Sequence, residues 1–438
     1  MIYFGTDGIR GVVGEDITHE VAFKCGNALG SLKKHAKIIV GTDTRVTADF
    51  LFCSLASGAV MAGADIYFVG IAPTPAISFL VQKHHADFGV MLTASHNPAS
   101  HNGIKVFDCN GEKVDIKVQT EIERGFAHQK VVEALQIGKI IKKPKFLDEY
   151  ISFIAKNSKK IENLKVVIDC SNGAGSVVAG KVFKKLGANL IKINSTKNGK
   201  NINKNCGALY PQKLASIVQK VGADVGFAFD GDADRIVMVD NNGKICDGDQ
   251  IILFLTDMFK KHNMLSTGAV VGTSQSNMAM EKRLEKCNLK LIRADVGDQF
   301  VTQELKKRHL QIGGEQSGHI ILYDYEKTGD GIFCATQICK FLSHEKDIDS
   351  NAKISSFLFY DMFEQYCLNI ATEKKFEIIN SAKFRVEVSE CENWLKDRGR
   401  IVCRASGTEN KLRIMVECND EFLAQNILHR LENVAKEL

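Results

Sequence analysis

Two short polar segments, each directly after an apolar stretch, carry residues that could do chemistry. Ser95 lies on a predicted turn after the apolar run Val90-Met-Leu92, so that a nucleophilic hydroxyl would be presented to a ligand. A second apolar run, Phe227-Ala-Phe229, leads into three carboxylates at alternate positions: Asp230, Asp232 and Asp234. Carboxylate oxygens are the ligands that a divalent cation bound beside phosphate requires. Together the two segments predict metal-assisted phosphoryl transfer through a phosphoserine.

Both segments also have a purely structural interpretation. The side chains of Thr93, Ser95 and Asn97 could simply satisfy the backbone groups of the turn. We do not expect His96 to serve as a base for Ser95, because adjacent side chains on a strand or turn point apart, and so a hydrolase triad is not encoded. The acidic segment could be a solvated turn, although three carboxylates this close repel one another unless a cation neutralises them. An EF-hand is excluded, because its sixth and twelfth positions lack the required Gly and Glu.

Two glycine-containing segments further along the chain could bind the rest of a sugar phosphate. In Gly313-Gly-Glu-Gln-Ser-Gly-His319, a carboxylate and a hydroxyl two residues apart, Glu315 and Ser317, can receive adjacent sugar hydroxyls from one side. His319 could exchange protons near neutral pH, or it could be a structural hydrogen-bonding residue. The second segment could surround a non-reacting phosphate dianion with two hydroxyls, backbone N–H groups and two arginines, although it is also typical of a hairpin connection. Its residues are Arg404, Ser406, Gly407, Thr408 and Arg413.

Three further cations could offset charge at a transferring phosphoryl group. Arg235 directly follows the acidic segment and could bind a phosphate oxygen in a bidentate manner. Arg10 belongs to the N-terminal Gly5-Thr-Asp-Gly-Ile-Arg10, and Lys105 follows ten residues after the serine. Lys105 could equally be an exposed strand lysine, because charge stabilisation depends on placement in space.

These segments must be positioned by a fold of several units. Three stretches repeat one scheme, in which a Val- and Ile-rich strand leads into a polar, Gly-containing loop and then a helical pattern: 37–45, 166–175 and 269–277. Such runs are typical of buried strands in mixed or parallel sheets flanked by helices. After about residue 370 the pattern changes to alternating strands, at 382–388 and 412–417, and then a helical stretch at 421–436. The sequence therefore predicts three α/β domains and a smaller C-terminal α+β domain, at 1–145, 146–247, 248–365 and 366–438.

Composition excludes several other classes of protein. With 45% apolar and 25% charged residues, the 438-residue chain is typical of a globular protein. The net charge of +5 is modest, and the lysine clusters lack interleaved aromatic residues, so no nucleic-acid partner is expected. The 13 cysteines are scattered without metal-ligand spacing, which predicts mostly buried, reduced thiols. No segment resembles a signal peptide or a membrane span, so we expect a cytoplasmic protein without a membrane partner.

Taken in order, these segments resemble the α-D-phosphohexomutase family over the whole chain. The resemblance is carried by Phe4-Gly-Thr-Asp-Gly-Ile-Arg-Gly11, Ala94-Ser-His-Asn-Pro98, Asp230-Gly-Asp-Ala-Asp-Arg235, Gly314-Glu-Gln-Ser-Gly-His319 and Arg404-Ala-Ser-Gly-Thr408. It implies four domains around one cleft, a small sugar phosphate as substrate and a homodimer as one form of assembly. Ser95 would carry the phosphoryl group, and Mg²⁺ would lie between the phosphoserine and the three aspartates. The resemblance implies a role in proton transfer for Lys105 and His319. It implies that Glu315 and Ser317 bind sugar hydroxyls. The residues that would hold the distal phosphate are Arg404, Ser406, Gly407, Thr408 and Arg413.

The residue between Glu315 and Ser317, Gln316, resembles the amino-sugar members of the family. The implied reaction converts glucosamine 6-phosphate into glucosamine 1-phosphate through a 1,6-bisphosphate, on the route to UDP-N-acetylglucosamine, after priming by glucosamine or glucose 1,6-bisphosphate. Three alternatives remain: a glucose or mannose phosphate mutase of the same family, a haloacid-dehalogenase-like phosphatase that uses Asp230, and a non-catalytic sugar-phosphate sensor. The chain departs from the family pattern at Asn410 and Lys411, at His101, and at Gln299, where an arginine is common and one phosphate or inter-domain contact is put in doubt.

Overall fold

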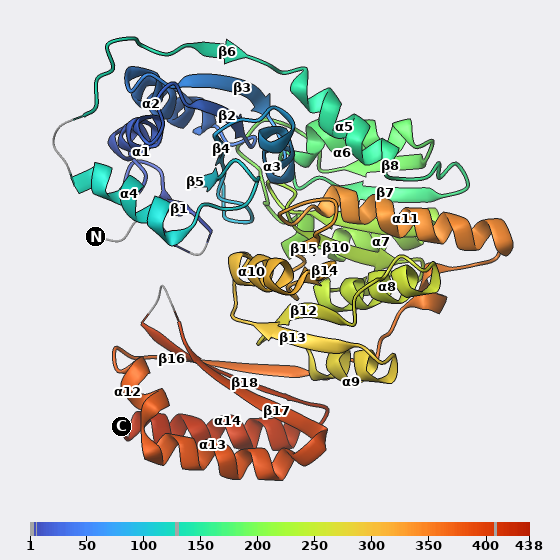
Figure 1. The fold of residues 1–438 in the computed structure, drawn as a ribbon. Helices are drawn as coiled ribbons and strands as arrows, with labels where there is room; N and C mark the ends of the chain where they lie inside the picture. Colours follow the sequence, from blue (N-terminus) through green and yellow to red (C-terminus); the bar gives the residue numbers. More distant parts are fainter. Residues whose placement is uncertain (1–3, 6, 128–130, 407–409) are drawn as a thin grey trace.

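The computed structural model describes residues 4, 5, 7–127, 131–406 and 410–438, and it contains four sheets that follow one another along the chain (Figure 1). The first sheet has the order β1-β5-β4-β2-β3-β6. Its centre is parallel, whereas β1 and β5 run antiparallel to their neighbours. The strands are β1 (Ile9–Val12), β2 (Lys37–Thr42), β3 (Asp65–Ile71), β4 (Phe88–Leu92), β5 (His101–Phe107) and β6 (Ile140–Lys142).

Helices cover both faces of this first sheet, which is why its central strands are apolar throughout. Five of the six residues of β2 are buried. One face packs against α1 (His19–Ser31), α2 (Ala48–Met61) and α4 (Ile116–Ala127), and the other against α3 (Thr74–Lys83). The outer face of α3 shares a buried cluster with α5 (Phe146–Lys156), so the first and second domains are packed together through apolar side chains.

The second and third sheets repeat the mixed α/β arrangement. The second has the order β11-β10-β9-β7-β8, with parallel pairing of β7 to β8 and β9. The third has the order β13-β12-β14-β15, in which only β15 is antiparallel to its neighbour. The strands are β7 (Lys165–Asp169), β8 (Asn189–Ile193), β9 (Val225–Phe229), β10 (Ile236–Asp240), β11 (Ile245–Cys246), β12 (Ala269–Thr273), β13 (Lys290–Ala294), β14 (Ile312–Gly314) and β15 (Ile320–Leu322). The helices are α6 (Gly175–Lys185), α7 (Gln212–Val221), α8 (Gly248–Lys261), α9 (Met278–Lys286), α10 (Asp298–Arg308) and α11 (Gly331–Ile348).

The C-terminal domain has an antiparallel sheet with helices on one side and a core of its own (Figure 1). The sheet order is β16-β18-β17. Its elements are β16 (Gln365–Ala371), α12 (Lys375–Asn380), α13 (Ala382–Leu395), β17 (Gly399–Ala405), β18 (Lys411–Cys418) and α14 (Glu421–Lys436). The predicted fold class, three α/β domains followed by a smaller α+β domain, is confirmed.

One predicted element is wrong. Residues 382–388 were expected to form a strand, but they begin α13, whose N-cap Ser381 accepts a hydrogen bond from the Phe384 backbone. Val386, which alternation would bury, is 59% exposed, whereas Phe384, Cys391 and Leu395 are buried. That spacing follows the helical period, which a seven-residue window is too short to distinguish from alternation.

Two other expectations concern the cysteines and the membrane. All 13 cysteines are unpaired, and eight of them are buried, as predicted. Among the described helices, none combines the length and the apolar character needed to cross a membrane.

Candidate active site

Ser95 lies on the loop between β4 and β5, and its side chain meets the acidic loop of the second domain. Its backbone is in the left-handed region (φ 50°), held by a hydrogen bond from the Ser95 N–H to Thr93 Oγ1 at 2.9 Å. Ser95 Oγ donates to Asp230 Oδ2 at 2.5 Å, across 135 positions of sequence. The sequence led us to expect an accessible hydroxyl, but Ser95 is fully buried. The reason is that the two loops close directly on each other in this arrangement of the domains.

The side chains of Ser95 and His96 were expected to point apart, and this expectation is wrong. His96 Nδ1 lies 3.4 Å from Ser95 Oγ, because the left-handed backbone at Ser95 turns the adjacent side chains toward the same side. Burial lowers the pKa of His96 to about 4, with Arg235 and Arg10 adding to the effect. His96 is therefore a neutral neighbour of the Ser95 hydroxyl near pH 7.

The acidic loop connects β9 to β10 and gathers the three aspartates in one buried place. One carboxylate oxygen from each of Asp230, Asp232 and Asp234 lies within 4.8 Å of the others. Gly231 allows the approach of the Ser95 loop, because a Cβ at this position would lie 2.4 Å from the Ser95 carbonyl oxygen. Asp232 Oδ1 and Asp234 Oδ1 are buried without a hydrogen-bond partner. Three converging carboxylates, two of which carry a buried oxygen without a partner, fit a divalent metal ion.

The charges around this loop are balanced by Lys105 from β5. Its Nζ lies 2.8 Å from Asp232 Oδ2 and 2.6 Å from Asp234 Oδ2, and the lysine is buried. Burial by itself would lower the pKa of Lys105, but Asp232 and Asp234 raise it, so the ammonium group is retained. Burial and repulsion from the other two aspartates raise the pKa of Asp230 well above its usual range. Lys105 is thus a buried ion-pair partner, which excludes the alternative of an exposed strand lysine.

Two arginines and a lysine complete the cationic side of the site. Arg10, on β1, pairs with Asp7, and its buried Nε has no partner. Arg235 also has a buried Nε without a partner; burial would lower its pKa, but Asp234 and Asp230 raise it. Lys113, which the sequence analysis missed, pairs with both Asp7 and Asp298 and so links the first domain to the third. The charges of both arginines interact with those of the aspartates, and their unpartnered Nε–H groups make them donors for a phosphate group.

A further arginine that the sequence analysis missed holds the Ser95 loop. Arg45 is 2% exposed and donates from Nη2 to the carbonyl oxygens of Ser95 and Asn97, at 3.0 and 2.9 Å. Its Nη1 donates to the carbonyl oxygens of Pro98 and His101, and its Nε to Asp43 Oδ2. His101 departs from the family pattern in its side chain, but the contact with Arg45 uses its backbone carbonyl oxygen, which any residue would supply. Arg45 ends the predicted strand and loop at 37–45, but nothing in the sequence indicated that it would bind the carbonyl oxygens of the Ser95 loop.

The predicted sugar-binding loop lies between β14 and β15. Glu315 is nearly buried and accepts from the Gly297 N–H at 3.1 Å, whereas Ser317 is exposed. His319 Nε2 accepts from the Gly329 N–H at 2.9 Å, and its Nδ1 lies 3.8 Å from Asp234 Oδ2. The structure thus brings His319 beside the acidic loop.

Gln299, which departs from the family pattern, lies on α10 and donates its backbone N–H to Asp298.

The predicted phosphate site lies on β17 and β18 and is described only in part. Arg404 and Arg413 stand directly opposite each other in the antiparallel register. Burial lowers the pKa of Arg404, and the charge of Arg413 adds to this effect. Ser406 is buried and receives a hydrogen bond on its carbonyl oxygen from Lys375 Nζ at 2.7 Å. Gly407 and Thr408 lie outside the described residues.

Comparison with known proteins identifies the class that this fold and site define. Residues 1–132, 148–243 and 247–358 match in turn the α/β/α domains I, II and III of phosphoglucomutase/phosphomannomutase, and residues 368–434 match its C-terminal domain. The chain therefore belongs to the phosphoglucomutase/phosphomannomutase family. The resemblance to the phosphohexomutases that the sequence motifs indicated is confirmed.

Among curated proteins, the chain is similar to phosphoglucosamine mutases. It is 39% identical to that of Ruthia magnifica over 442 residues, covering 99% of both chains, and 37% identical to that of Clostridioides difficile over 449 residues, again covering 99% of both. Among solved structures, a family protein from Burkholderia thailandensis superposes with a TM-score of 0.83 at 22% identity, covering 100% of this chain and 97% of that one. Aspergillus fumigatus N-acetylphosphoglucosamine mutase, in complex with GlcNAc-6P and magnesium, gives 0.67 at 17% identity, covering 100% and 96%. These two structures support the fold.

Proposed function

We propose that this protein interconverts glucosamine 6-phosphate and glucosamine 1-phosphate through a phosphorylated Ser95. The single observation that carries the proposal is the contact of Ser95 Oγ with Asp230, which joins the nucleophile loop to a buried three-carboxylate site. The full-length similarity to curated phosphoglucosamine mutases bears out the activity predicted from the sequence. Family membership disfavours the phosphatase and the sensor, and a preference for glucose or mannose phosphate is left to the experiment below.

In the proposed reaction, Ser95 and the surrounding cations move a phosphoryl group between two oxygens. The P–O bond to Ser95 Oγ breaks while the C1 hydroxyl of glucosamine 6-phosphate forms a new P–O bond; this hydroxyl gives up its proton and the freed Ser95 oxygen takes one up, which yields the 1,6-bisphosphate. The bisphosphate turns within the cleft, and Ser95 takes back the other phosphoryl group. Arg10, Arg235 and Lys105 would stabilise charge on the transferring group, while Glu315 and Ser317 orient the sugar. Arg404, Ser406, Gly407, Thr408 and Arg413 would hold the distal phosphate.

Mg²⁺ is the metal we assign to Asp230, Asp232 and Asp234, with a phosphoserine oxygen as a further ligand. When bound, it would supply positive charge beside the transferring phosphoryl oxygens. Because Lys105 keeps its proton between two of these aspartates, we assign it an electrostatic role more readily than that of a base. His319 remains a candidate for proton transfer, since it is held beside Asp234.

Several further assignments rest on the family and belong to the same proposal. The enzyme would be primed by glucosamine or glucose 1,6-bisphosphate, which phosphorylates Ser95. The domain limits 1–145, 146–247, 248–365 and 366–438, a cytoplasmic location and a homodimer stay predictions.

The proposal is tested by trapping the phosphoenzyme. Ser95→Ala should lower turnover of glucosamine 6-phosphate by about 10³-fold or more, because the covalent intermediate cannot form. The wild-type protein incubated with labelled bisphosphate should retain a label that hydroxylamine does not release, as expected of a serine ester. A hydroxylamine-sensitive label, or substantial turnover by Ser95→Ala, would contradict the assignment. Comparing glucosamine, glucose and mannose phosphates in the same assay tests the sugar preference.

A further inference from the structure

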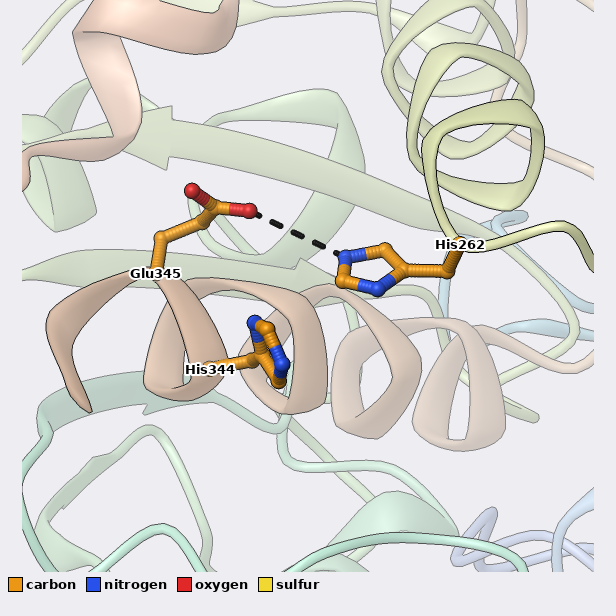
Figure 2. Close-up of side chains that lie close together, drawn as sticks. All are labelled: His262, His344 and Glu345. Atoms are coloured by element: carbon orange, nitrogen blue, oxygen red, sulfur yellow. Dashed lines mark ion pairs between the residues drawn. The ribbon is translucent and has the colours of Figure 1, made fainter. Parts of the chain in front are cut away.

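A second group of metal-ligating side chains lies in the third domain, away from the loops of the active site. It consists of His262, at the end of α8, with His344 and Glu345 near the end of α11, and we call it the His-Glu cluster (Figure 2). One ligand atom from each residue lies within 4.8 Å of the others. Among the described residues, this group and the aspartate triad are the two that meet this criterion.

The His-Glu cluster is arranged around an imidazole nitrogen that lacks a hydrogen bond. His262 Nε2 is buried without a hydrogen bond and lies 3.8 Å from Glu345 Oε1, toward which it points in Figure 2. The His262 ring stacks on Phe341, with centroids 5.2 Å apart, and meets the His344 ring edge-on at 4.7 Å. Packing against Phe341 therefore fixes the direction of His262, while His344 is exposed and leaves the cluster open to solvent.

We propose that the His-Glu cluster binds a transition metal ion of the zinc class, with water in the fourth position. Two imidazoles and one carboxylate are a common zinc ligand set, with bond lengths of about 2.0–2.2 Å. Nitrogen ligands favour such ions over Mg²⁺, so this site and the three aspartates would select different metals. His262 Nε2, which has no hydrogen bond, would gain a bond to the metal ion.

One ion pair has to break for the metal to bind. Lys261 Nζ lies 2.6 Å from Glu345 Oε1, and the lysine side chain is 48% exposed. It can therefore turn into solvent, and the bound metal ion would replace its charge beside the Glu345 carboxylate, which is only 9% exposed. Metal binding would then join the end of α8 to α11 and hold two helices of the third domain together. This inference does not depend on the proposed catalytic function.

The test measures Zn²⁺ binding by equilibrium dialysis of the full chain in excess Mg²⁺. The wild-type protein should bind one Zn²⁺ per chain at this site, and His344→Ala should weaken binding by about tenfold or more through loss of one ligand. Lys261→Ala should act in the opposite direction and tighten binding, because it frees Glu345. Co²⁺ in place of Zn²⁺ should give visible absorption bands of a four-coordinate ion in the wild-type protein and not in His344→Ala.

Two controls separate this site from general histidine or carboxylate binding. His429→Ala removes an exposed histidine on α14 and should leave Zn²⁺ binding unchanged. Asp232→Asn alters the aspartate triad and should also leave it unchanged. His344 is exposed, so its replacement should not unfold the chain. Equal Zn²⁺ affinity in the wild-type protein and His344→Ala, or weaker binding by Lys261→Ala, would overturn the proposal.

Discussion

At the scale of single residues, the active site balances buried charges that a bound metal would rearrange. Lys105 supplies positive charge between Asp232 and Asp234, although these aspartates are also the proposed metal ligands. A lysine and a divalent ion beside the same carboxylates are partly redundant for stability. Metal binding at the three aspartates can therefore be tested without an activity assay, by measuring the stability of Lys105 variants.

We expect Lys105→Met to destabilise the metal-free protein by about 3–5 kcal/mol, because it leaves two buried carboxylates without their cation. Added Mg²⁺ should restore much of this loss, so the variant should gain more stability from Mg²⁺ than the wild-type protein does. Urea unfolding with and without Mg²⁺ measures both values. Lys142→Met, on an exposed lysine of β6, is the matched control. A loss of stability that Mg²⁺ leaves unchanged would count against metal binding at the triad.

Asp249, in the first turn of α8, should make stability depend on pH. It is fully buried and accepts from the Asn277 N–H, while its Oδ1 has no partner. Burial, with repulsion from Asp247, raises the pKa of Asp249 to about 7. Between about pH 4 and pH 7 the folded protein therefore holds a proton that the unfolded chain has released, so stability falls as pH rises, by at most about 1.4 kcal/mol per unit.

Asp249→Asn should remove this contribution, because an amide does not ionise. The free energy of unfolding of the variant should change less between pH 4.5 and pH 7.5 than that of the wild-type protein, and it should exceed the wild-type value at the upper end. Denaturant titrations at several pH values measure this difference. Asp361→Asn, at an exposed aspartate, should reproduce the wild-type profile. Parallel profiles for the wild-type protein and Asp249→Asn would contradict the argument.

At the level of secondary-structure elements, the Ser95 loop is held in shape by side chains from outside it: Asn203 donates to the Ser95 and Asn97 carbonyl oxygens, and Arg45 makes more of the contacts. The Arg45 guanidinium donates to four backbone carbonyl oxygens of this loop and the start of β5. A planar fork can serve several acceptors at once, whereas a lysine ammonium cannot reach them all. Arg45 should therefore position Ser95 without touching the transferring phosphoryl group.

Arg45→Lys should lower the free energy of unfolding by about 1.5–3 kcal/mol, because buried carbonyl groups lose charged donors. It should lower kcat by about tenfold or more through misplacement of Ser95, with a much smaller change in KM. Steady-state kinetics and urea unfolding measure the two effects. Arg124→Lys on α4, at an exposed arginine, should change neither. A variant that loses stability but keeps its kcat would show that the clamp is structural only.

At the scale of the whole molecule, the first three domains and the fourth are joined differently. One buried apolar cluster runs through the first three, whereas the C-terminal domain has its own core. Its contacts with the third domain include polar ones, such as Arg400 Nη2 to the Ser276 carbonyl oxygen at 2.5 Å and Lys282 Nζ to the Asp397 carbonyl oxygen at 2.6 Å. Polar inter-domain contacts permit relative motion more readily than a shared apolar core. The C-terminal domain is therefore the unit that should move when substrate binds.

We expect glucosamine 6-phosphate to draw the C-terminal domain toward the Ser95 loop, because the proposed phosphate site and the nucleophile belong to different domains. Small-angle X-ray scattering should then show a smaller radius of gyration with substrate than without it. Arg404→Ala should raise KM by about 10- to 100-fold and abolish the compaction at the same substrate concentration. An unchanged radius of gyration in the wild-type protein at saturating substrate would contradict closure by this domain.

The class of fold and most residues of the candidate site could be predicted from sequence patterns alone. Apolar runs at 90–92 and 227–229 predicted the strands that precede Ser95 and Asp230, β4 and β9, because strand patterns are local to the sequence. The alternate spacing of the three aspartates likewise predicted their convergence, and the five motifs predicted the family. Where only seven residues were considered, at 382–388, the same reasoning gave a strand in place of α13.

Which distant residues meet could not be predicted from the sequence and follows from how the domains pack. The contact of Ser95 with Asp230, the burial of Lys105 between two aspartates and the clamp by Arg45 depend on domain packing. The nearness of His96 to Ser95 depends on one left-handed backbone angle, and the His-Glu cluster on the packing of α8 against α11. Spacing along a chain reports periodicity within one element. Burial and charge pairing arise between elements, so they become visible only when those elements are packed together.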